Sequence, residues 1–593
     1  DYIYIDEASD EFEEGDNLYF EASFVDVQPY NNPINDWNLE ITLFTTQGDY
    51  VYTGTDVTSP GSAFWSFTAP SLPTNHTFLR NIDGYIAGYY KISGTDGQNY
   101  YHEAGGNIVI FKEPQSSKLM VKYLSPTSIE LKYQFTGGSE NDIYYGNTSG
   151  TPYNGTGITQ GNSPIDNGSN TSIELTGLTP CTEYYFSGKA INSKGSSDYW
   201  EEEKVLLFEA PDQETVYFYP DGVVMDNEYT FTGNHLFGDN LIIEPGAVVT
   251  FSGGYVYFYE GTGVIIQPGG KLILDGSTCT APCGDTWNGI EVWGNADEHQ
   301  FTINGQNYQG QLIMDGATIS NALSAVELWK PDDYNKTGGI IKATDSYFIN
   351  NAKSVYALYY NNFHPVSEKE MANVSTFRDC VFEINEDYIP DRIFYKHVDL
   401  AHVNGIRFYG CDFLMDDVTG TSEWNCGIAS YSSGFQTYAL CENYSNPCTE
   451  YDECYFLGFN SAVYATNGGD NDYTFHVNRA IFENNIYGIR VEGVQNVTVL
   501  HSEFYIGYNP DKDDKCDNRN LNASGYGISL NSSSGFAIED NYFTKLQGAP
   551  SGLYIGTYIA NTEDVDELYD NVSSGVSFGT LAEGKNWFYD ITY

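Results

Sequence analysis

Residues 240–294 read NLIIEPGAVVTFSGGYVYFYEGTGVIIQPGGKLILDGSTCTAPCGDTWNGIEVWG. In this stretch the pattern apolar-apolar-x-Pro-Gly occurs twice, at 242–246 and at 265–269, which lie 23 positions apart. Short apolar runs broken by Pro-Gly turns at such a period are typical of a β-solenoid, in which each thin coil buries its apolar face against the next. We therefore predict an all-β chain whose residues 212–593 form a right-handed parallel β-helix.

A second repeating unit continues this pattern toward the C-terminus. It is a small residue followed two positions later by Phe. Strand alternation sends both side chains to one face, so stacked coils should form a ladder of Phe rings beside a column of small side chains. The longer spacings between units predict loop insertions, for example from Thr421 to Cys448. The units end in Phe348, Phe382, Phe413, Phe456, Phe482, Phe504 and Phe543.

The region before the repeats predicts two smaller β domains. Residues 1–113 contain alternating apolar segments separated by turn residues at the intervals of an Ig-like β-sandwich. Residues 116–208 carry the run Leu175-Thr-Gly-Leu-Thr-Pro-Cys-Thr-Glu-Tyr184. This run resembles the turn into strand F of fibronectin type III domains. The resemblance implies a β-sandwich in which the Tyr184 hydroxyl clamps the preceding loop, with Tyr133 filling the volume of the core Trp that is usual in the family.

Composition restricts the partners. The 593 residues include 26 basic and 81 acidic side chains, a formal net charge of −55. Nucleic acids, anionic membrane surfaces and acidic polysaccharides would repel such a chain, unless calcium screened the charge of the last. No run of 18 apolar residues exists, so we expect no membrane insertion. The chain begins with Asp1, which fits a mature product whose export signal has been removed.

The cysteines indicate an oxidising compartment. Two close pairs, Cys279/Cys283 and Cys441/Cys448, lie in stretches rich in turn residues and lack the second half of a zinc site. We predict that each pair forms a disulfide. Stacked Cys380, Cys411 and Cys454 are expected to be buried thiols that act as small apolar side chains. Sequons that would accept a glycan occur at Asn75, Asn147, Asn335, Asn496 and Asn571.

Catalytic and metal signals are weak. Paired carboxylates such as Asp332-Asp333 and Asp416-Asp417 can act as acid and base, but adjacent pairs arise by chance in so acidic a chain, and we predict no catalytic residue. No cofactor is expected to be required, with calcium as the candidate ion, because carboxylate oxygens alternate in one turn. A plain insertion loop is the alternative for that segment. The four candidate calcium ligands are Asp511, Asp513, Asp514 and Asp517.

Aromatic residues of the opening stretch suggest two alternatives. They would form a sugar-stacking strip on the surface, or they would serve as ordinary strand residues that pack on their neighbours. The second alternative is favoured. The residues are Tyr255, Tyr257, Tyr259, Trp287 and Trp293.

The opening stretch, together with 287–294 and Asp315-Gly-Ala-Thr-Ile-Ser-Asn-Ala322, resembles the large extracellular β-helix proteins of Bacteroidota, which are commonly exported by type IX secretion. The sorting domain of that family is not recognisable before Tyr593, and we expect it to have been cleaved on export or to lie outside this chain. The resemblance implies a secreted or cell-surface location and roles in adhesion, matrix or glycan contact.

These observations predict a non-enzymatic extracellular protein. It would act in adhesion or as a structural subunit of an extracellular assembly or filament, with further copies of itself or cell-surface glycans as partners. The alternatives are a polysaccharide lyase, a glycoside hydrolase or a glycan-binding protein on the same scaffold. A panel of glycans, with and without calcium, would distinguish these classes.

Overall fold

The structure is a computed structural model of the chain. Its backbone description covers residues 2–8, 11–13, 17–25, 34–43, 50–56, 62–68, 86–96, 101–111, 117–135, 138–192, 195–209, 216–389, 392–416, 421–443, 447–469, 471–507, 524–562, 566–584 and 590–592. The described chain is all β-structure and divides into two compact units, Asp1–Glu209 and Ala210–Tyr593. No helix in the described part of the chain is long and apolar enough to cross a membrane.

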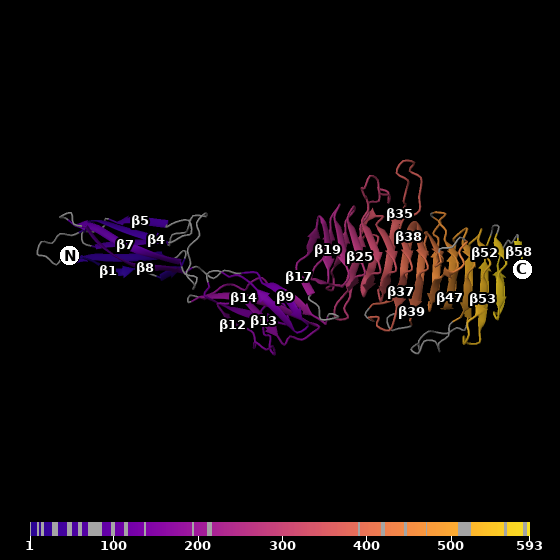
Figure 1. Cartoon of the computed structure of the whole chain (residues 1–593), viewed down its shortest axis with the longest axis horizontal. Helices are drawn as coiled ribbons and strands as arrows, with labels where there is room; N and C mark the ends of the chain where they lie inside the picture. The colour runs from indigo at the N-terminus through magenta and orange to yellow at the C-terminus, as the bar shows by residue number, and fades with distance from the viewer. Residues whose placement is uncertain are drawn as a thin grey trace. The chain divides into compact units, whose positions relative to one another are not determined.

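The first unit contains two pairs of sheets (Figure 1). Almost all pairings are antiparallel, as expected for sandwiches. In the first pair, one sheet contains β1 (Tyr2–Ala8), β3 (Asn17–Val25) and β6 (Ser62–Thr68). The other sheet contains β2 (Glu11–Glu13), β8 (Tyr101–Phe111), β7 (Ile86–Asp96), β4 (Ile34–Leu43) and β5 (Tyr50–Asp56). In the second pair, one sheet contains β9 (Met120–Ser125), β10 (Ser128–Lys132) and β13 (Ser172–Thr176). The other sheet contains β12 (Ile165–Gly168), β11 (Glu140–Gly146), β14 (Thr182–Asn192), β15 (Gly195–Ser196) and β16 (Glu203–Leu207).

The second pair of sheets contains the predicted tyrosine clamp. The Tyr184 hydroxyl accepts a hydrogen bond from the backbone N–H of Thr179 at 3.0 Å. Tyr133 is buried, as expected, but it shares its core position with Trp200, whose ring centroid lies 4.9 Å away. Trp200 lies in the chain between β15 and β16, far in sequence from the strand on which a core Trp was sought.

The second unit is a stack of coils, each of which contributes one strand to each of three parallel faces (Figure 1). The first face has 13 strands in parallel register. They are β17 (Val216–Tyr219), β20 (Asn234–Phe237), β23 (Tyr255–Phe258), β26 (Thr278–Thr280), β29 (Thr318–Ser320), β34 (Tyr347–Ile349), β37 (Val381–Ile384), β39 (Asp412–Met415), β44 (Cys454–Leu457), β47 (Ala480–Asn485), β50 (Glu503–Ile506), β53 (Tyr542–Lys545) and β56 (Val572–Ser574).

The second and third faces are linked through the long strand β38 (Phe394–Tyr409), which contributes to both. The second face also contains β18 (Val223–Met225), β21 (Leu241–Ile243), β24 (Gly263–Ile266), β27 (Trp287–Val292), β30 (Ala322–Glu327), β35 (Lys353–Tyr360), β40 (Thr421–Tyr431), β45 (Ser461–Thr466), β48 (Tyr487–Glu492), β51 (Ser524–Asn531), β54 (Leu553–Ala560) and β57 (Phe578–Glu583).

The third face follows the second along each coil. It contains β19 (Glu228–Thr232), β22 (Val248–Ser252), β25 (Lys271–Asp275), β28 (Gln311–Asp315), β33 (Ile340–Thr344), β36 (Thr376–Arg378), β41 (Gly434–Tyr438), β46 (His476–Asn478), β49 (Thr498–Leu500), β52 (Ala537–Glu539), β55 (Glu567–Tyr569) and β58 (Asp590–Thr592). The 23-residue repeat of the opening stretch is a true coil length, because Ile242 pairs with Ile265.

Two antiparallel hairpins leave the stack. They are β31 (Trp329–Lys330) with β32 (Asp333–Thr337), and β42 (Leu440–Cys441) with β43 (Tyr451–Asp452). The predicted insertion from Thr421 to Cys448 is therefore wrong in its extent. Its first part supplies β40 and β41 to the second and third faces, and the departure from the stack begins only near Leu440.

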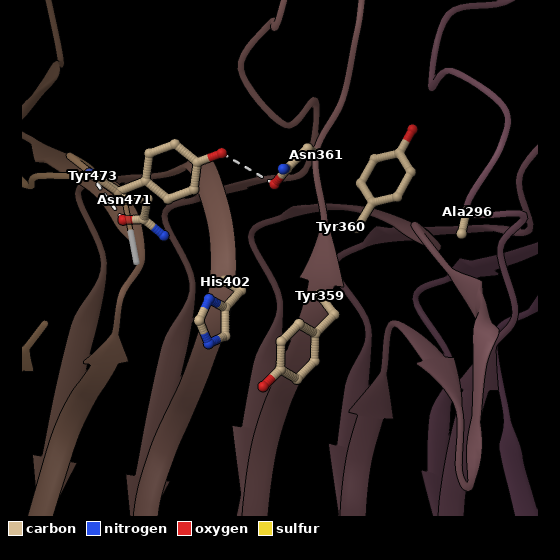
Figure 2. A pocket seen from close by; sticks show the side chains of 7 residues that line it. All are labelled: Ala296, Tyr359, Tyr360, Asn361, His402, Asn471 and Tyr473. Atoms are coloured by element: carbon tan, nitrogen blue, oxygen red, sulfur yellow. Dashed lines mark hydrogen bonds between the residues drawn. The ribbon is translucent and has the colours of Figure 1, made fainter. Parts of the chain in front are cut away.

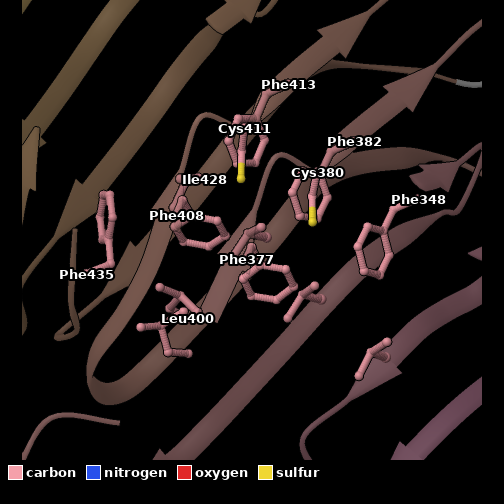
Figure 3. Packing of buried hydrophobic residues seen from close by; sticks show 14 of the residues in the cluster. Phe348, Phe377, Cys380, Phe382, Leu400, Phe408, Cys411, Phe413, Ile428 and Phe435 are labelled. Carbon is pink, nitrogen blue, oxygen red and sulfur yellow. The ribbon is translucent and has the colours of Figure 1, made fainter. Parts of the chain in front are cut away.

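The predicted Phe ladder forms the core beneath the first face (Figure 3). Consecutive rings from Phe348 to Phe543 stack with centroids 4.6–4.9 Å apart, the spacing of neighbouring strands. Cys380, Cys411 and Cys454 lie in the adjoining column as buried free thiols. Burial raises the pKa of the Cys411 thiol well above its usual value, so it remains protonated.

Candidate functional site

One corner of the stack, where the second face turns into the third, holds a column of residues with positive φ. The strand pairings place these residues at the same position of their coils; in the coil of β45 this position falls to Asn467, whose φ is not positive. Gly and Asn tolerate the left-handed region, and the Ser members of the column have small side chains. The column contains Tyr359, His402, Ser432, Gly493, Ser532, Asn561 and Gly584.

Tyr359 and His402 are the two ring-bearing members of the column. Their φ values are 45° and 53°. Such an angle is an outlier for a bulky residue such as Tyr, whereas His, like Asn and Asp, is enriched in this region. Left-handed backbone costs roughly 1–2 kcal/mol for a residue other than Gly. Strain of this kind is concentrated at functional sites, where it positions a side chain. The same turn is made with Ser, Asn or Gly elsewhere in the column, so the fold itself does not require rings here.

The two rings belong to a continuous set of contacting side chains that we call the aromatic row, formed by the buried Trp329 and by Tyr334, Tyr359, His402 and Tyr431. Tyr359 and His402 stack with centroids 4.4 Å apart and planes 13° apart. Tyr334 and Tyr431 contact opposite ends of this pair edge-on, at 5.5 and 5.3 Å. Tyr334, Tyr359 and Tyr431 expose 60, 49 and 45% of their surface, so all three side chains are accessible to a ligand.

A cavity of about 400 Å³ adjoins the row (Figure 2). In this view the rings of Tyr359 and His402 lie below Asn361 and Tyr473, which are joined by a hydrogen bond from the Tyr473 hydroxyl to the Asn361 side-chain oxygen at 3.0 Å. We call this cavity the amide pocket. It is lined by Ala296, Tyr359, Tyr360, Asn361, His402, Asn471 and Tyr473.

Hydrogen bonds fix the loops around the amide pocket. The buried Tyr360 hydroxyl donates to the backbone carbonyl of Glu298 at 2.7 Å, which holds the loop that contains Ala296. Asn471 donates through its side-chain amide to the carbonyl of Ser432 at 2.9 Å. These contacts hold the pocket loops on the coils that carry the rings.

A second cavity, of about 500 Å³, shares Asn361 with the amide pocket. Asp297, Glu368 and Glu370 line it together with Asn362 and Phe363. Burial and the nearby Glu370 carboxylate raise the pKa of the Tyr473 hydroxyl, which therefore stays protonated and able to donate.

This arrangement suits a neutral, hydroxyl-rich ligand. Exposed aromatic faces offer flat apolar area with polar edges. The amides and hydroxyls of the pocket supply both donors and acceptors. A few polar groups placed beside apolar and aromatic surface are typical of small-ligand sites.

The structure places the predicted disulfides differently. Cys441 and Cys448 form a disulfide, which closes the β42–β43 hairpin. The predicted bridge between Cys279 and Cys283 is wrong. Cys279 is a free, buried thiol, because strand alternation in β26 points it into the core, while Cys283 is disulfide-bonded to another cysteine.

The candidate calcium ligands Asp511, Asp513, Asp514 and Asp517 lie outside the described residues, as does the sequon at Asn75. Within the described part of the chain, no group of three or more His, Cys, Asp or Glu side chains is arranged to hold a metal ion.

The described sequons differ in accessibility. Asn147, Asn335 and Asn496 are exposed. Asn571 is engaged within the stack, where its side-chain amide donates to the carbonyl of Ile538 at 2.6 Å and its oxygen accepts from the backbone N–H of Asn541 at 3.1 Å. A glycan on the Asn571 amide would compete with this contact.

The aromatic residues singled out from the opening stretch are mainly structural. Tyr257, Tyr259 and Trp287 are buried, which agrees with the packing alternative. Sequence reasoning missed Tyr359 and His402, because the signal is visible only when the coils are aligned: two rings occupy a column position that elsewhere holds Ser, Asn or Gly.

No protein-family model matches the chain, and no curated protein sequence is similar to it. Solved structures that resemble part of the chain include fibronectin type III domains. A mutant fibronectin type III domain called FN3tt is 18% identical (TM-score 0.13; 16% of this chain, 96% of that chain). The FN5 domain of Drosophila Lar is 20% identical (0.13; 15% and 91%). A two-domain segment of chicken tenascin is 10% identical (0.18; 34% and 97%).

Proposed function

We propose that the protein is an extracellular adhesion protein that binds a neutral polysaccharide along the aromatic row, on a right-handed parallel β-helix. The observation that carries this proposal is the stacked pair of rings, Tyr359 and His402, of which Tyr359 holds a left-handed corner position that is costly for a bulky side chain. Their parallel stack and the adjoining amide pocket offer sugar rings a platform and hydrogen-bonding partners.

Charge supports the choice of a neutral ligand. The net charge of −55 opposes long-range attraction of acidic polysaccharides and nucleic acids. The second cavity adds carboxylates near the row, which would repel a uronic acid. Location outside the cell is supported by the Cys441–Cys448 disulfide, because such bonds persist in oxidising compartments. Export by type IX secretion is part of the same proposal.

The test is binding of the whole chain to an array of neutral and acidic polysaccharides, followed by titration calorimetry with the best neutral ligand. Tyr359→Ala combined with His402→Ala should weaken binding about tenfold or more, because aromatic groups at the centre of a contact carry much of its free energy. Tyr347→Ala is the matched control: Tyr347 is also exposed but lies on the first face, and its removal should leave affinity unchanged.

Two outcomes would contradict the proposal. One is equal affinity of the double variant and the control. The other is the absence of binding to every neutral polysaccharide. Electron microscopy of the same preparation that showed filaments would then favour a structural subunit, with further copies of the chain as the partner.

A further inference from the structure

The cavity of about 500 Å³, which we call the carboxylate pocket, is lined by two loops. The first loop joins β27 to β28, and the second joins β35 to β36. Both loops connect the second face to the third, so they leave the stack at the corner that carries Tyr359 and His402. Asp297 comes from the first loop. The second loop supplies Asn361, Asn362, Phe363, Glu368 and Glu370.

Hydrogen bonds between the two loops hold the pocket in shape. The buried Asn362 side chain accepts a hydrogen bond from the backbone N–H of Gln300 at 3.0 Å and donates one to the carbonyl of Ala372 at 2.9 Å. The buried Gln300 side chain in turn accepts a hydrogen bond from the backbone N–H of Val374 at 2.9 Å. A site that is formed before its ligand arrives loses less free energy on binding. The walls of this pocket are therefore preorganised.

The lining of the pocket is negatively charged. Among the residues that the structure describes, three carboxylates line it and no Lys or Arg does. Asp297, Glu368 and Glu370 are exposed, so a ligand can reach them, and they form no ion pair with any residue of the described ranges. A concave site lined by one sign of charge concentrates ions of the opposite sign. The pocket therefore favours a cation.

The pocket suits an organic ammonium group better than a bare metal ion. In the described part of the chain no group of three acidic, His or Cys side chains is arranged to hold a metal ion, so these carboxylates do not converge on one point. Phe363 adds an apolar surface that a metal ion would not use. An ammonium group donates three hydrogen bonds and is attracted to an aromatic face. A cavity of about 500 Å³ also has room for the carbon ring that carries the ammonium.

The carboxylate pocket adjoins the proposed binding surface. Asn361 lines both this pocket and the amide pocket. The Tyr473 hydroxyl donates to the Asn361 side-chain oxygen at 3.0 Å (Figure 2), and burial and the nearby Glu370 carboxylate raise the pKa of that hydroxyl. A polysaccharide with one ring at the Tyr359–His402 pair and the next in the amide pocket would therefore place a following unit at the carboxylates.

The charge of the whole chain favours the same class of ligand. With 26 basic and 81 acidic residues, the chain carries a net charge of −55. Such a field attracts a polycation from a distance and speeds its association. A lysine-rich peptide would share this attraction, but it lacks the ring hydroxyls that the amides of the adjoining pocket can bind. The observations therefore favour a sugar that carries an amine.

We propose that the carboxylate pocket binds the protonated amine of an amino sugar, and that the polysaccharide on the aromatic row contains such units. This inference rests on the proposed function and narrows its ligand. Neutral units lie on the row, and a unit with a free amine occupies the pocket. The amine adds affinity to the binding of the neutral units and is not required for it.

The test is titration calorimetry of the whole chain with hexasaccharides of glucosamine and of galactosamine at pH 6, each as the free amine and fully N-acetylated. Acetylation removes the positive charge and leaves the sugar backbone unchanged. We expect the amine form of at least one sugar to bind about tenfold more tightly than its acetylated form, because hydrogen bonds between charged groups are the stronger ones. Asp297→Asn combined with Glu368→Gln and Glu370→Gln should abolish this difference and leave the array binding of neutral polysaccharides unchanged.

The matched control removes three exposed carboxylates from the third face, by Glu228→Gln, Asp275→Asn and Asp315→Asn. It changes the net charge as much as the pocket variant does, and it should keep the preference for the amine. Near-ultraviolet circular dichroism checks that both variants fold. Loss of the preference in both variants would show that overall charge attracts the amine. That result, or a preference that persists in the pocket variant, would overturn the assignment of the pocket.

Further outcomes separate this inference from the proposed function. Equal affinity for the amine and acetylated forms of both sugars, while neutral polysaccharides still bind on the array, would overturn the amino sugar alone. Absence of binding to every hexasaccharide and to every neutral polysaccharide would overturn both proposals. Hexalysine that binds as tightly as the amine hexasaccharides, and loses this affinity in the pocket variant, would replace the amino sugar by a basic peptide.

Discussion

The same corner of the stack is built in two ways. In the coils of β35 and β38 the turn from the second face to the third is made by Tyr359 and His402, whereas in the coils of β51 and β54 it is made by Ser532 and Asn561. The backbone is left-handed in all four positions, and the Phe ladder runs beneath both regions. The comparison shows that the scaffold fixes the backbone conformation of the turn but not the type of side chain that occupies it. Aromatic side chains can therefore be placed on chosen coils.

The largest expected effect tests the core that the two regions share. Phe413→Ala, in the coil of His402, and Phe543→Ala, in the coil of Ser532, should each lower the free energy of unfolding by about 3–5 kcal/mol, because both remove a fully buried ring from the ladder. Urea unfolding followed by circular dichroism measures this. Only Phe413→Ala should also weaken polysaccharide binding, since stacked coils contact mainly their neighbours.

Equal loss of binding in the two Phe variants would show that the row depends on the whole stack and not on its own coils. The control is Phe578→Ala. Phe578 in β57 is 46% exposed, so Phe578→Ala should lower the free energy of unfolding by much less than either of the other two substitutions.

An intermediate effect is expected when an aromatic ring is introduced at the turn that Ser532 makes in the coil of β51. Ser532→Tyr should lower the free energy of unfolding by about 1–2 kcal/mol, because a bulky residue would then adopt the left-handed angle of 51°. Ser532→Asn should change it little, since Asn tolerates this region. A Tyr variant as stable as its Asn counterpart would remove the argument that the Tyr359 ring is costly.

The smallest effect concerns the carboxyl of Asp412, which lies in β39, directly after the strand that carries His402. Burial, and secondarily Asp379, raises the pKa of Asp412 to about 6, from a usual value near 4. Below about pH 4 the carboxyl is protonated in both folded and unfolded chains. As pH rises toward 6, only the unfolded chain releases the proton readily, so the folded state loses stability. Asp412→Asn should therefore stabilise the protein at pH 7.5 by about 1 kcal/mol, after allowance for the partial exposure of the carboxyl.

The pH dependence distinguishes this cause from a packing effect. The gain from Asp412→Asn should vanish at pH 3.5, because the carboxyl that it replaces is then protonated in both folded and unfolded chains. A gain that is the same at both pH values would contradict burial of the charge as its source. Thermal unfolding at a series of pH values provides the measurement.

The repeats were readable from sequence because they depend on local chemistry. Pro-Gly turns at a 23-residue spacing predicted coils whose residues Ile242 and Ile265 do pair, and the small-x-Phe unit predicted the stacked rings. In the first unit the Leu175–Tyr184 run predicted the hydrogen bond between Tyr184 and Thr179. Each of these signals lies within a few residues of the contact or recurs at a fixed interval.

The proposed binding surface could not be predicted in this way. Tyr334 reaches the row through a hairpin, and Asn361 and Tyr473 are 112 residues apart in sequence. Coil lengths vary through this region, so the column that joins Tyr359 to His402 appears only once the register of β35 and β38 is known. The Cys279/Cys283 pair misled for a related reason: closeness in sequence carried no information about which side chain points into the core.

The opening of single coils can be measured separately at Cys380, Cys411 and Cys454. A thiol reagent reacts with a buried cysteine only when its coil opens, so the labelling rate of each thiol reports the opening frequency of its own coil. Three neighbouring coils thus each carry one thiol whose labelling rate can be measured. Identical rates would mean that the coils open as one block, whereas graded rates would show fraying that travels along the stack from one side.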